Sequence, residues 1–172
     1  MNKWRLPFLA VLCFVSESIL VDVWPKGDVY IRYFFVPRFF LIFLVLMAVH
    51  FGGTRAMGYG FIFGFLYDVV YTELLGVYAF AYTLIAYLAG KAMRWFHQNW
   101  LVLFLMSLLA VAVLDSYVYG IQLLIGRTDW PFAVFWGRRL WPTLLLNAVF
   151  LLVFLHPLER WMAKIRRSEQ EE

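Results

Sequence analysis

Long apolar runs alternate with short polar connections along the whole chain. A helix needs about 20 mostly apolar residues to cross a hydrocarbon core of roughly 30 Å, and the pattern predicts six such spans. They are residues 6–23, 36–51, 56–71, 74–92, 100–125 and 140–158. The five connections between them are too short to bury a core of their own. Residues 1–158 are therefore predicted to form a single all-α transmembrane domain.

Residues 159–172 differ in kind from the spans that precede them. We expect Pro157 to end the sixth helix, after which apolar residues recur at the spacing of one helix face and basic residues fill the other. The pattern places Trp161, Lys164, Arg166 and Arg167 at the lipid interface. A short basic amphipathic helix of this kind lies in the interface and is attracted by anionic lipid. It would serve as an anchor for the sixth helix or as a docking surface for a cytoplasmic partner.

Composition supports the membrane interpretation. Of the 172 residues, 64% are hydrophobic and only 15% are charged, and the mean hydropathy is +0.75. A soluble domain is closer to half apolar. Nine Lys and Arg residues fall on one side of the predicted membrane and six on the other, so the positive-inside rule places both termini in the cytoplasm. Basic residues that flank the spans account for the net charge of +4, and no nucleic-acid partner is needed to explain it.

Ionisable side chains occur within the spans or at their ends, where each costs about 2.5 to 3.5 kcal/mol on insertion. The acids are Glu17, Asp22, Asp68 and Asp115, and the bases are Arg38, Arg138 and Arg139. The predicted topology places all seven in the outer half of the bilayer. Acids near the ends of outward helices and arginines at the starts of inward helices lie at the unfavourable poles of their own helix dipoles. Pairing between neighbouring helices would satisfy both signs, and an outward-facing polar patch or cavity is the functional alternative. The sequence leaves open which acid pairs with which arginine.

Three further residues point to close helix packing. Gly60 and Gly64 are four residues apart, so they share one helix face and allow another backbone to approach closely. Asp68 lies on the same face. Asn147, in the sixth span, is expected to form a hydrogen bond to a neighbouring helix.

Catalytic and metal-binding motifs are missing from the sequence. It contains no HExxH pattern, no cysteine pair, no glycine-rich phosphate loop and no Ser-His-Asp grouping. The three histidines fall at separate helix ends without other metal ligands beside them. We therefore predict no catalytic residue, no metal site and no cofactor, and we expect that the protein is not an enzyme.

Several short motifs occur in a characteristic order. They are VPRF at 36–39, YGFIFGFLYD at 59–68, LGVY at 75–78, and Arg139 followed by PTLLLN at 142–147. In this order and spacing the chain resembles the rod shape-determining protein MreD family over nearly its whole length, and most of all members from rod-shaped Gram-positive bacteria. The resemblance implies a non-enzymatic subunit of the machinery that inserts peptidoglycan along the side wall, located in the bacterial cell membrane.

The resemblance also implies partners and a fold. The partner of the family is MreC, a single-pass membrane protein, and the wider assembly includes MreB, RodZ, a glycan polymerase and a transpeptidase. Family members are similar to the six-helix substrate-binding subunits of energy-coupling-factor vitamin transporters. The docking motif of those subunits, Ala-x-x-x-Ala, is absent here because Ala10 is followed four residues later by Phe14.

Two function classes follow from these observations. In the first, the chain is a membrane scaffold that binds the membrane helix of MreC, with Arg38, Asp68 and Arg139 organising an outer polar patch. In the second, it is a small-molecule-binding subunit of a transporter, with an outward-facing pocket lined by Glu17, Asp68, Asp115 and Arg139. A proton-coupled pump is disfavoured because the charges gather in one leaflet and leave no relay through the other.

Overall fold

The computed structural model describes residues 4–23, 33–93 and 99–170, and these residues form helices and no strand. The helices are α1 (Arg5–Val23), α3 (Phe39–Phe51), α4 (Gly53–Tyr71), α5 (Val77–Ala92), α6 (Trp100–Leu124), α7 (Phe132–Phe135), the π-helix η1 (Trp136–Leu140) and α8 (Trp141–Gln170). Each of the six long helices overlaps one predicted span. The prediction of an all-α chain is confirmed.

Among the residues that the structure describes, two helical segments are long and apolar enough to cross a membrane, α6 and the run Phe132–Glu169. The apolar helices α3 and α5 are shorter. The outer faces of these helices are themselves apolar: on α8, for example, Val149, Leu152 and Val153 are each about 60% exposed. Such a surface is suited to lipid contact.

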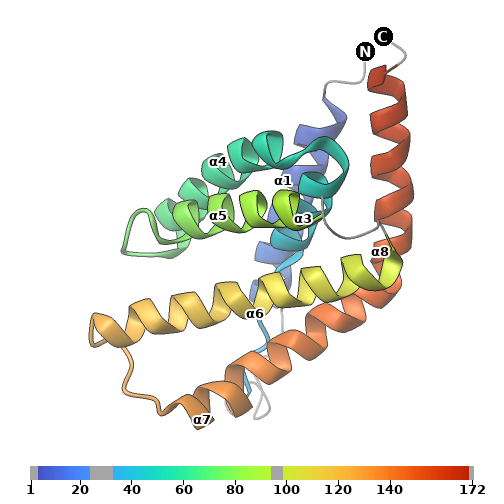
Figure 1. The fold of residues 1–172 in the computed structure, drawn as a ribbon. Helices are drawn as coiled ribbons and strands as arrows, with labels where there is room; N and C mark the ends of the chain where they lie inside the picture. The colour runs from blue at the N-terminus through green and yellow to red at the C-terminus, as the bar shows by residue number, and fades with distance from the viewer. Residues whose placement is uncertain (1–3, 24–32, 94–98, 171–172) are drawn as a thin grey trace.

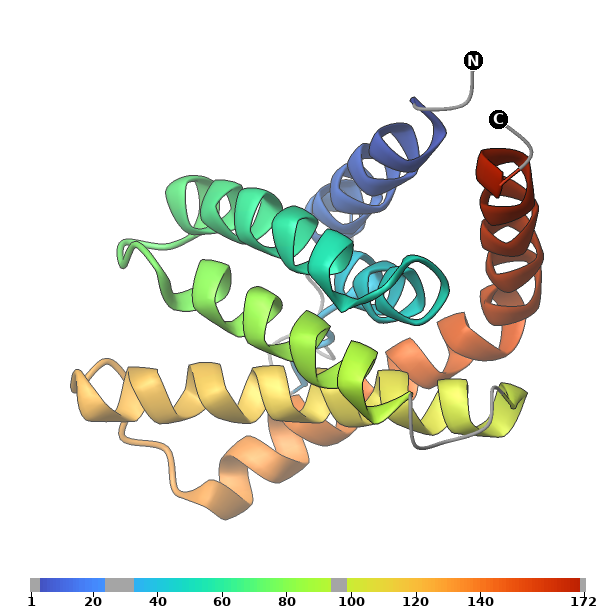
Figure 2. The same ribbon diagram turned by 45° about the horizontal axis from the view of Figure 1, so that its top comes forward.

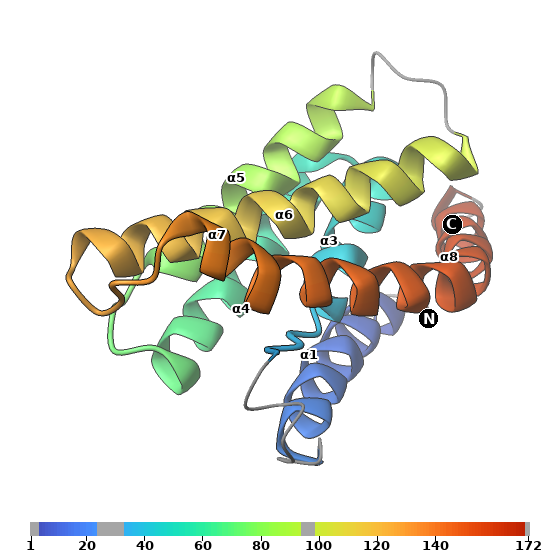
Figure 3. The same cartoon turned by 90° about the horizontal axis from the view of Figure 1, so that it is seen from below.

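The helix α3 forms the centre of the molecule. Residues 40–47 are fully buried on every side, which is typical of an apolar helix enclosed by other helices. It packs against α1, α4, α5, α6 and α8. Figure 2 shows α1, α4 and α5 around it, and Figure 3 shows the side that α6 and α8 cover.

The helices α4 and α5 form a tightly packed hairpin, and glycines allow the close contact. A Cβ atom on Gly64 would lie 2.6 Å from the carbonyl oxygen of Tyr78, and one on Gly60 would lie 3.0 Å from that of Tyr82. At the other end of the hairpin, a Cβ atom on Gly90 would lie 2.7 Å from the Cα atom of Gly53. The two backbones are therefore in contact along the whole hairpin.

The helix α8 continues through Pro157, so the prediction that this proline ends the sixth helix is wrong. A proline inside a helix removes one backbone hydrogen bond, and its ring clash can be relieved by a bend. Figure 1 shows that bend, after which the second half of α8 runs across the direction of α6. Met162 and Ile165 of this second half are fully buried in the core.

The turns of the molecule gather at two opposite ends. Figure 1 shows the α4–α5 turn and the α6–α7 connection together at the left, whereas the α3–α4 turn and the bend of α8 lie at the right. The start of α1 and the end of α8 lie close to each other at the top of the same view.

Candidate functional site

The start of α3 places the buried guanidinium of Arg38 among four other helices. Its Nη2 donates to Oδ1 of Asp115 on α6 at 2.8 Å, and its Nη1 lies 3.7 Å from Oε1 of Glu17 on α1. Its Nη1 and Nη2 also donate to the hydroxyl groups of Tyr67 on α4 and Tyr78 on α5, at 3.1 and 3.3 Å respectively. We call these five residues the Arg38 cluster. A single side chain thereby connects five helices.

Burial makes the Arg38 cluster energetically important. The side chains of Arg38, Glu17 and Asp115 are each no more than 4% exposed. The guanidinium carbon also lies 5.8 and 5.4 Å from the ring centres of Tyr67 and Tyr78, within the range of a cation–π interaction. Removing one partner of a buried ion pair costs about 3 to 5 kcal/mol, because the other charge is left without compensation.

The backbone at the start of α3 is held by side chains from other helices. The N–H of Arg38 donates to Oδ1 of Asn147 at 2.9 Å, and Nδ2 of Asn147 donates to the carbonyl oxygen of Val36 at 3.0 Å. The N–H of Phe40 donates to Oε2 of Glu17 at 3.3 Å. These bonds satisfy backbone groups that the first turn of a helix leaves unpaired. They also connect α1 and α8 to the start of the central helix.

The carboxylate of Asp68 binds the N-terminus of α5. It is fully buried and accepts hydrogen bonds from the N–H groups of Gly76, Tyr78 and Ala79 at 2.9 to 3.0 Å. Although Asp68 lies at the unfavourable pole of its own helix, it therefore lies at the favourable pole of the next one. The hydroxyl group of Thr72 also donates to Oδ1 at 3.4 Å, so the partners of the carboxylate are backbone amides and a hydroxyl group and not an arginine side chain.

Within the described ranges, neither Arg138 nor Arg139 forms a hydrogen bond or an ion pair with a residue of the Arg38 cluster. Arg138 is exposed in η1, and Arg139 is partly buried. Neither forms an ion pair with another residue of the described ranges. The side chain of Asp22 lies outside what the structure describes. Of the seven ionisable residues, the structure brings together Glu17, Arg38 and Asp115.

Tyr67 and Tyr78 are site residues that the sequence interpretation missed. A buried tyrosine hydroxyl usually has a hydrogen-bond partner, and both residues fall beside polar landmarks of the sequence. Tyr67 precedes Asp68, and Tyr78 closes the LGVY motif. An apolar aromatic role is the simpler interpretation of either residue in a chain with 21% aromatic residues, so nothing in the pattern singles them out.

The described residues offer little that would support chemistry or transport. They contain no group of three or more His, Cys, Asp or Glu side chains placed to hold a metal ion. A hollow of about 160 Å³ opens between the α4–α5 turn and α6 and reaches Tyr67 and Tyr78. Its lining includes none of Glu17, Asp68, Asp115 and Arg139. The pocket expected for a transporter subunit therefore does not coincide with this hollow.

Over the described residues, the fold and the Arg38 cluster together define an all-helical protein with two segments apolar and long enough to span a membrane, whose buried charges join its own helices. The family model described as "rod shape-determining protein MreD" matches residues 2–165. The rod shape-determining protein MreD of Bacillus subtilis (strain 168) is 39% identical over 172 residues, which is the full length of both chains. The chain belongs to the rod shape-determining protein MreD family. No solved structure matches it significantly, so its similarity to transporter subunits remains a prediction.

Proposed function

We propose that the protein is a non-enzymatic scaffold subunit of the rod-shape complex, which binds MreC and helps to organise side-wall peptidoglycan synthesis. The observation that carries this proposal is membership of the MreD family across residues 2–165. The buried charges of the Arg38 cluster support a scaffold role, because they form contacts between helices and are not exposed to a substrate. MreB, RodZ, a glycan polymerase and a transpeptidase would complete the assembly.

We propose a multi-pass topology in the cell membrane with both termini in the cytoplasm. The α3–α4 turn and the bend of α8 lie at one end (Figure 1), and basic residues of that end include Arg55, Arg160 and Lys164. The positive-inside rule assigns such an end to the cytoplasm. The α4–α5 turn and the α6–α7 connection then face outward.

We also propose that the tail lies in the cytoplasmic interface. The second half of α8 runs across the direction of α6 (Figure 1), as a helix parallel to the membrane plane would. It exposes Trp161, Lys164, Arg166 and Arg167, and this combination of an aromatic ring with basic groups suits anionic lipid.

The membrane helix of MreC would pack into an apolar groove between α5 and α6. This groove has a volume of about 490 Å³. Small residues, Ala89 and Ala92 on α5 and Ala110 on α6, line it and would allow close approach of another helix. Leu109 and Val113 form its wall and are 58% and 47% exposed, so a partner can reach them without unfolding the protein.

A tryptophan in this groove should release the partner. We expect Leu109→Trp to reduce the amount of MreC that co-purifies in mild detergent by about tenfold, because overpacking costs about 1 to 3 kcal/mol. The matched control is Leu152→Trp on α8, where the side chain is 61% exposed and lines no part of the groove. Equal recovery of MreC with both variants would rule out the groove, and no recovery with the unaltered protein would rule out the partnership.

A further inference from the structure

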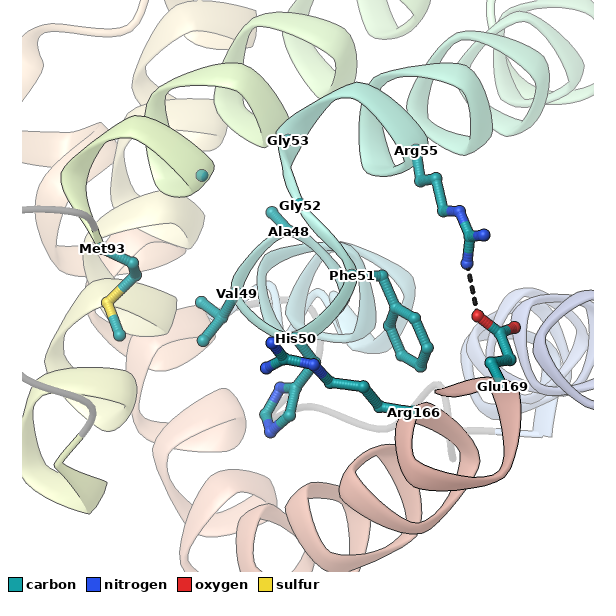
Figure 4. Close-up of a pocket in the computed structure, with 11 residues that line it drawn as sticks. Ala48, Val49, His50, Phe51, Gly52, Gly53, Arg55, Met93, Arg166 and Glu169 are labelled. Carbon is teal, nitrogen blue, oxygen red and sulfur yellow. Dashed lines mark hydrogen bonds and ion pairs between the residues drawn. The ribbon is translucent and has the colours of Figure 1, made fainter. Parts of the chain in front are cut away.

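A basic pocket opens at the end of the molecule that we assign to the cytoplasm. It has a volume of about 530 Å³ and lies between the α3–α4 turn, the end of α5 and the end of α8. Figure 4 shows Arg55, Arg166 and His50 at its edge, with Glu169 paired to Arg55. We propose that this pocket binds the phosphate-bearing head group of an anionic phospholipid.

The positive charge of the basic pocket comes from two independent sources. Arg55 and Arg166 contribute guanidinium groups from α4 and α8. The N-terminus of α4, at Gly52 and Gly53, also lines the pocket; it has no side-chain cap and no acidic residue in its first turn. Free backbone N–H groups and the helix dipole at such an end bind phosphate. The two guanidinium groups and the N-terminus of α4 therefore line the same pocket, as an anion site requires.

His50 adds a contact of a different kind. Its Nδ1 lies 3.0 Å from the carbonyl oxygen of Leu46, and because a carbonyl oxygen only accepts, Nδ1 carries the proton. In the tautomer with its proton on Nδ1, Nε2 is an acceptor, and the residue lines the pocket. A hydroxyl group beside the phosphate, such as those of a glycerol head group, would donate to Nε2.

The ion pair between Arg55 and Glu169 shows where a phosphate oxygen would bind. Nη1 of Arg55 lies 2.6 Å from Oε2 of Glu169, and the two side chains are 57% and 26% exposed. An exposed pair of this kind changes an equilibrium constant by less than about fivefold. A phosphate that also contacts Arg166 and the α4 N-terminus can therefore displace the Glu169 carboxylate.

A groove with apolar side chains in part of its lining lies next to the basic pocket and explains why the ligand is a lipid. This second groove, of about 710 Å³, shares Arg55 and Glu169 with the pocket and continues along Leu6, Met47 and Ile62. Ile62 is 64% exposed two turns beyond Arg55 on α4. A molecule with its phosphate in the pocket would lay an acyl chain in the groove. A free phosphate would leave the groove unused.

The test is native mass spectrometry of the full chain in detergent, with dioleoyl phosphatidylglycerol as the probe and phosphatidylcholine as the zwitterionic control. We expect one phosphatidylglycerol to be retained. Arg55→Gln and Arg166→Gln should each weaken retention about tenfold, through loss of a charge-assisted bond. Glu169→Gln should tighten it about threefold. Arg160→Gln, which removes an exposed charge of the same helix that lines neither the pocket nor the groove beside it, should change it by less than about twofold.

Three results would overturn the proposal. If Arg160→Gln weakened retention as much as Arg55→Gln, the lipid would be held by the overall charge of α8. If inorganic phosphate at millimolar concentration displaced the lipid, the ligand would be a free phosphate. If an acidic polypeptide co-purified through Arg55 while no lipid was retained, the pocket would be a protein-docking site.

A folding control accompanies the test. Because Arg55 is exposed, the Arg55→Gln variant without lipid should unfold at the same temperature as the unaltered chain without lipid. Lipid binding in the basic pocket depends on the proposed membrane orientation and not on MreC. The lipid experiment can therefore fail while the co-purification of MreC succeeds.

Discussion

Replacing Arg38 by alanine is expected to lower the free energy of unfolding by about 3 to 5 kcal/mol. The change removes the cation between Glu17 and Asp115, both of which are buried, and it leaves the hydroxyl groups of Tyr67 and Tyr78 without their shared donor. Titration of the purified protein with a denaturing detergent measures this free energy.

Two further variants separate the buried cluster from a general effect of removing an arginine. Arg138→Ala removes an exposed arginine near the start of α8 and should change the free energy of unfolding by no more than about 0.5 kcal/mol. Combining Arg38→Gln with Glu17→Gln and Asp115→Asn removes all three charges, and should recover part of the loss because no buried charge remains uncompensated. If Arg38→Ala and Arg138→Ala had the same free energy of unfolding, the Arg38 cluster would not stabilise the fold.

Gly64→Ala is expected to destabilise the α4–α5 hairpin by about 1 to 3 kcal/mol. The added Cβ would lie 2.6 Å from the carbonyl oxygen of Tyr78 and 2.7 Å from the Cα atom of Ala79, so the backbone of α5 must move. The displaced segment contains two of the amides that Asp68 binds, and the cap would weaken together with the packing.

Gly58→Ala provides a matched control on the same helix. A Cβ at Gly58 meets no atom within 4 Å, and alanine is favoured over glycine in a helix by about 1 kcal/mol. Thermal unfolding in one detergent should therefore place Gly64→Ala below the unaltered chain and Gly58→Ala at or slightly above it. Equal unfolding temperatures for the two variants would show that close approach at Gly64 is not required.

The sequence predicts the helices well because the length of each apolar run is a local property. It predicts much less about which side chains meet. The spacing of Gly60 and Gly64 shows that one face of α4 is open to close approach, but not that α5 fills it. The structure supplies that partner, because the α4–α5 turn is short and brings the start of α5 back beside the end of α4.

Asp68 and Arg38 show that the sequence does not identify all the partners of a buried charged residue. A dipole argument that considers only the helix of Asp68 makes this acid unfavourable, whereas the N-terminus of the following helix satisfies it. For Arg38, the sequence indicates a pair with an acid from another helix. It does not indicate that two acids and two tyrosines share the guanidinium, since this depends on how four helices pack around the start of α3.

Membership of the MreD family predicts that this chain determines rod shape. The most direct measurement is cell width in Bacillus subtilis depleted of its own MreD, which is 39% identical to this chain, with this chain expressed in its place. We predict rods of normal width. Round cells, with the chain present in the membrane at the level of the protein it replaces, would show that it does not determine rod shape.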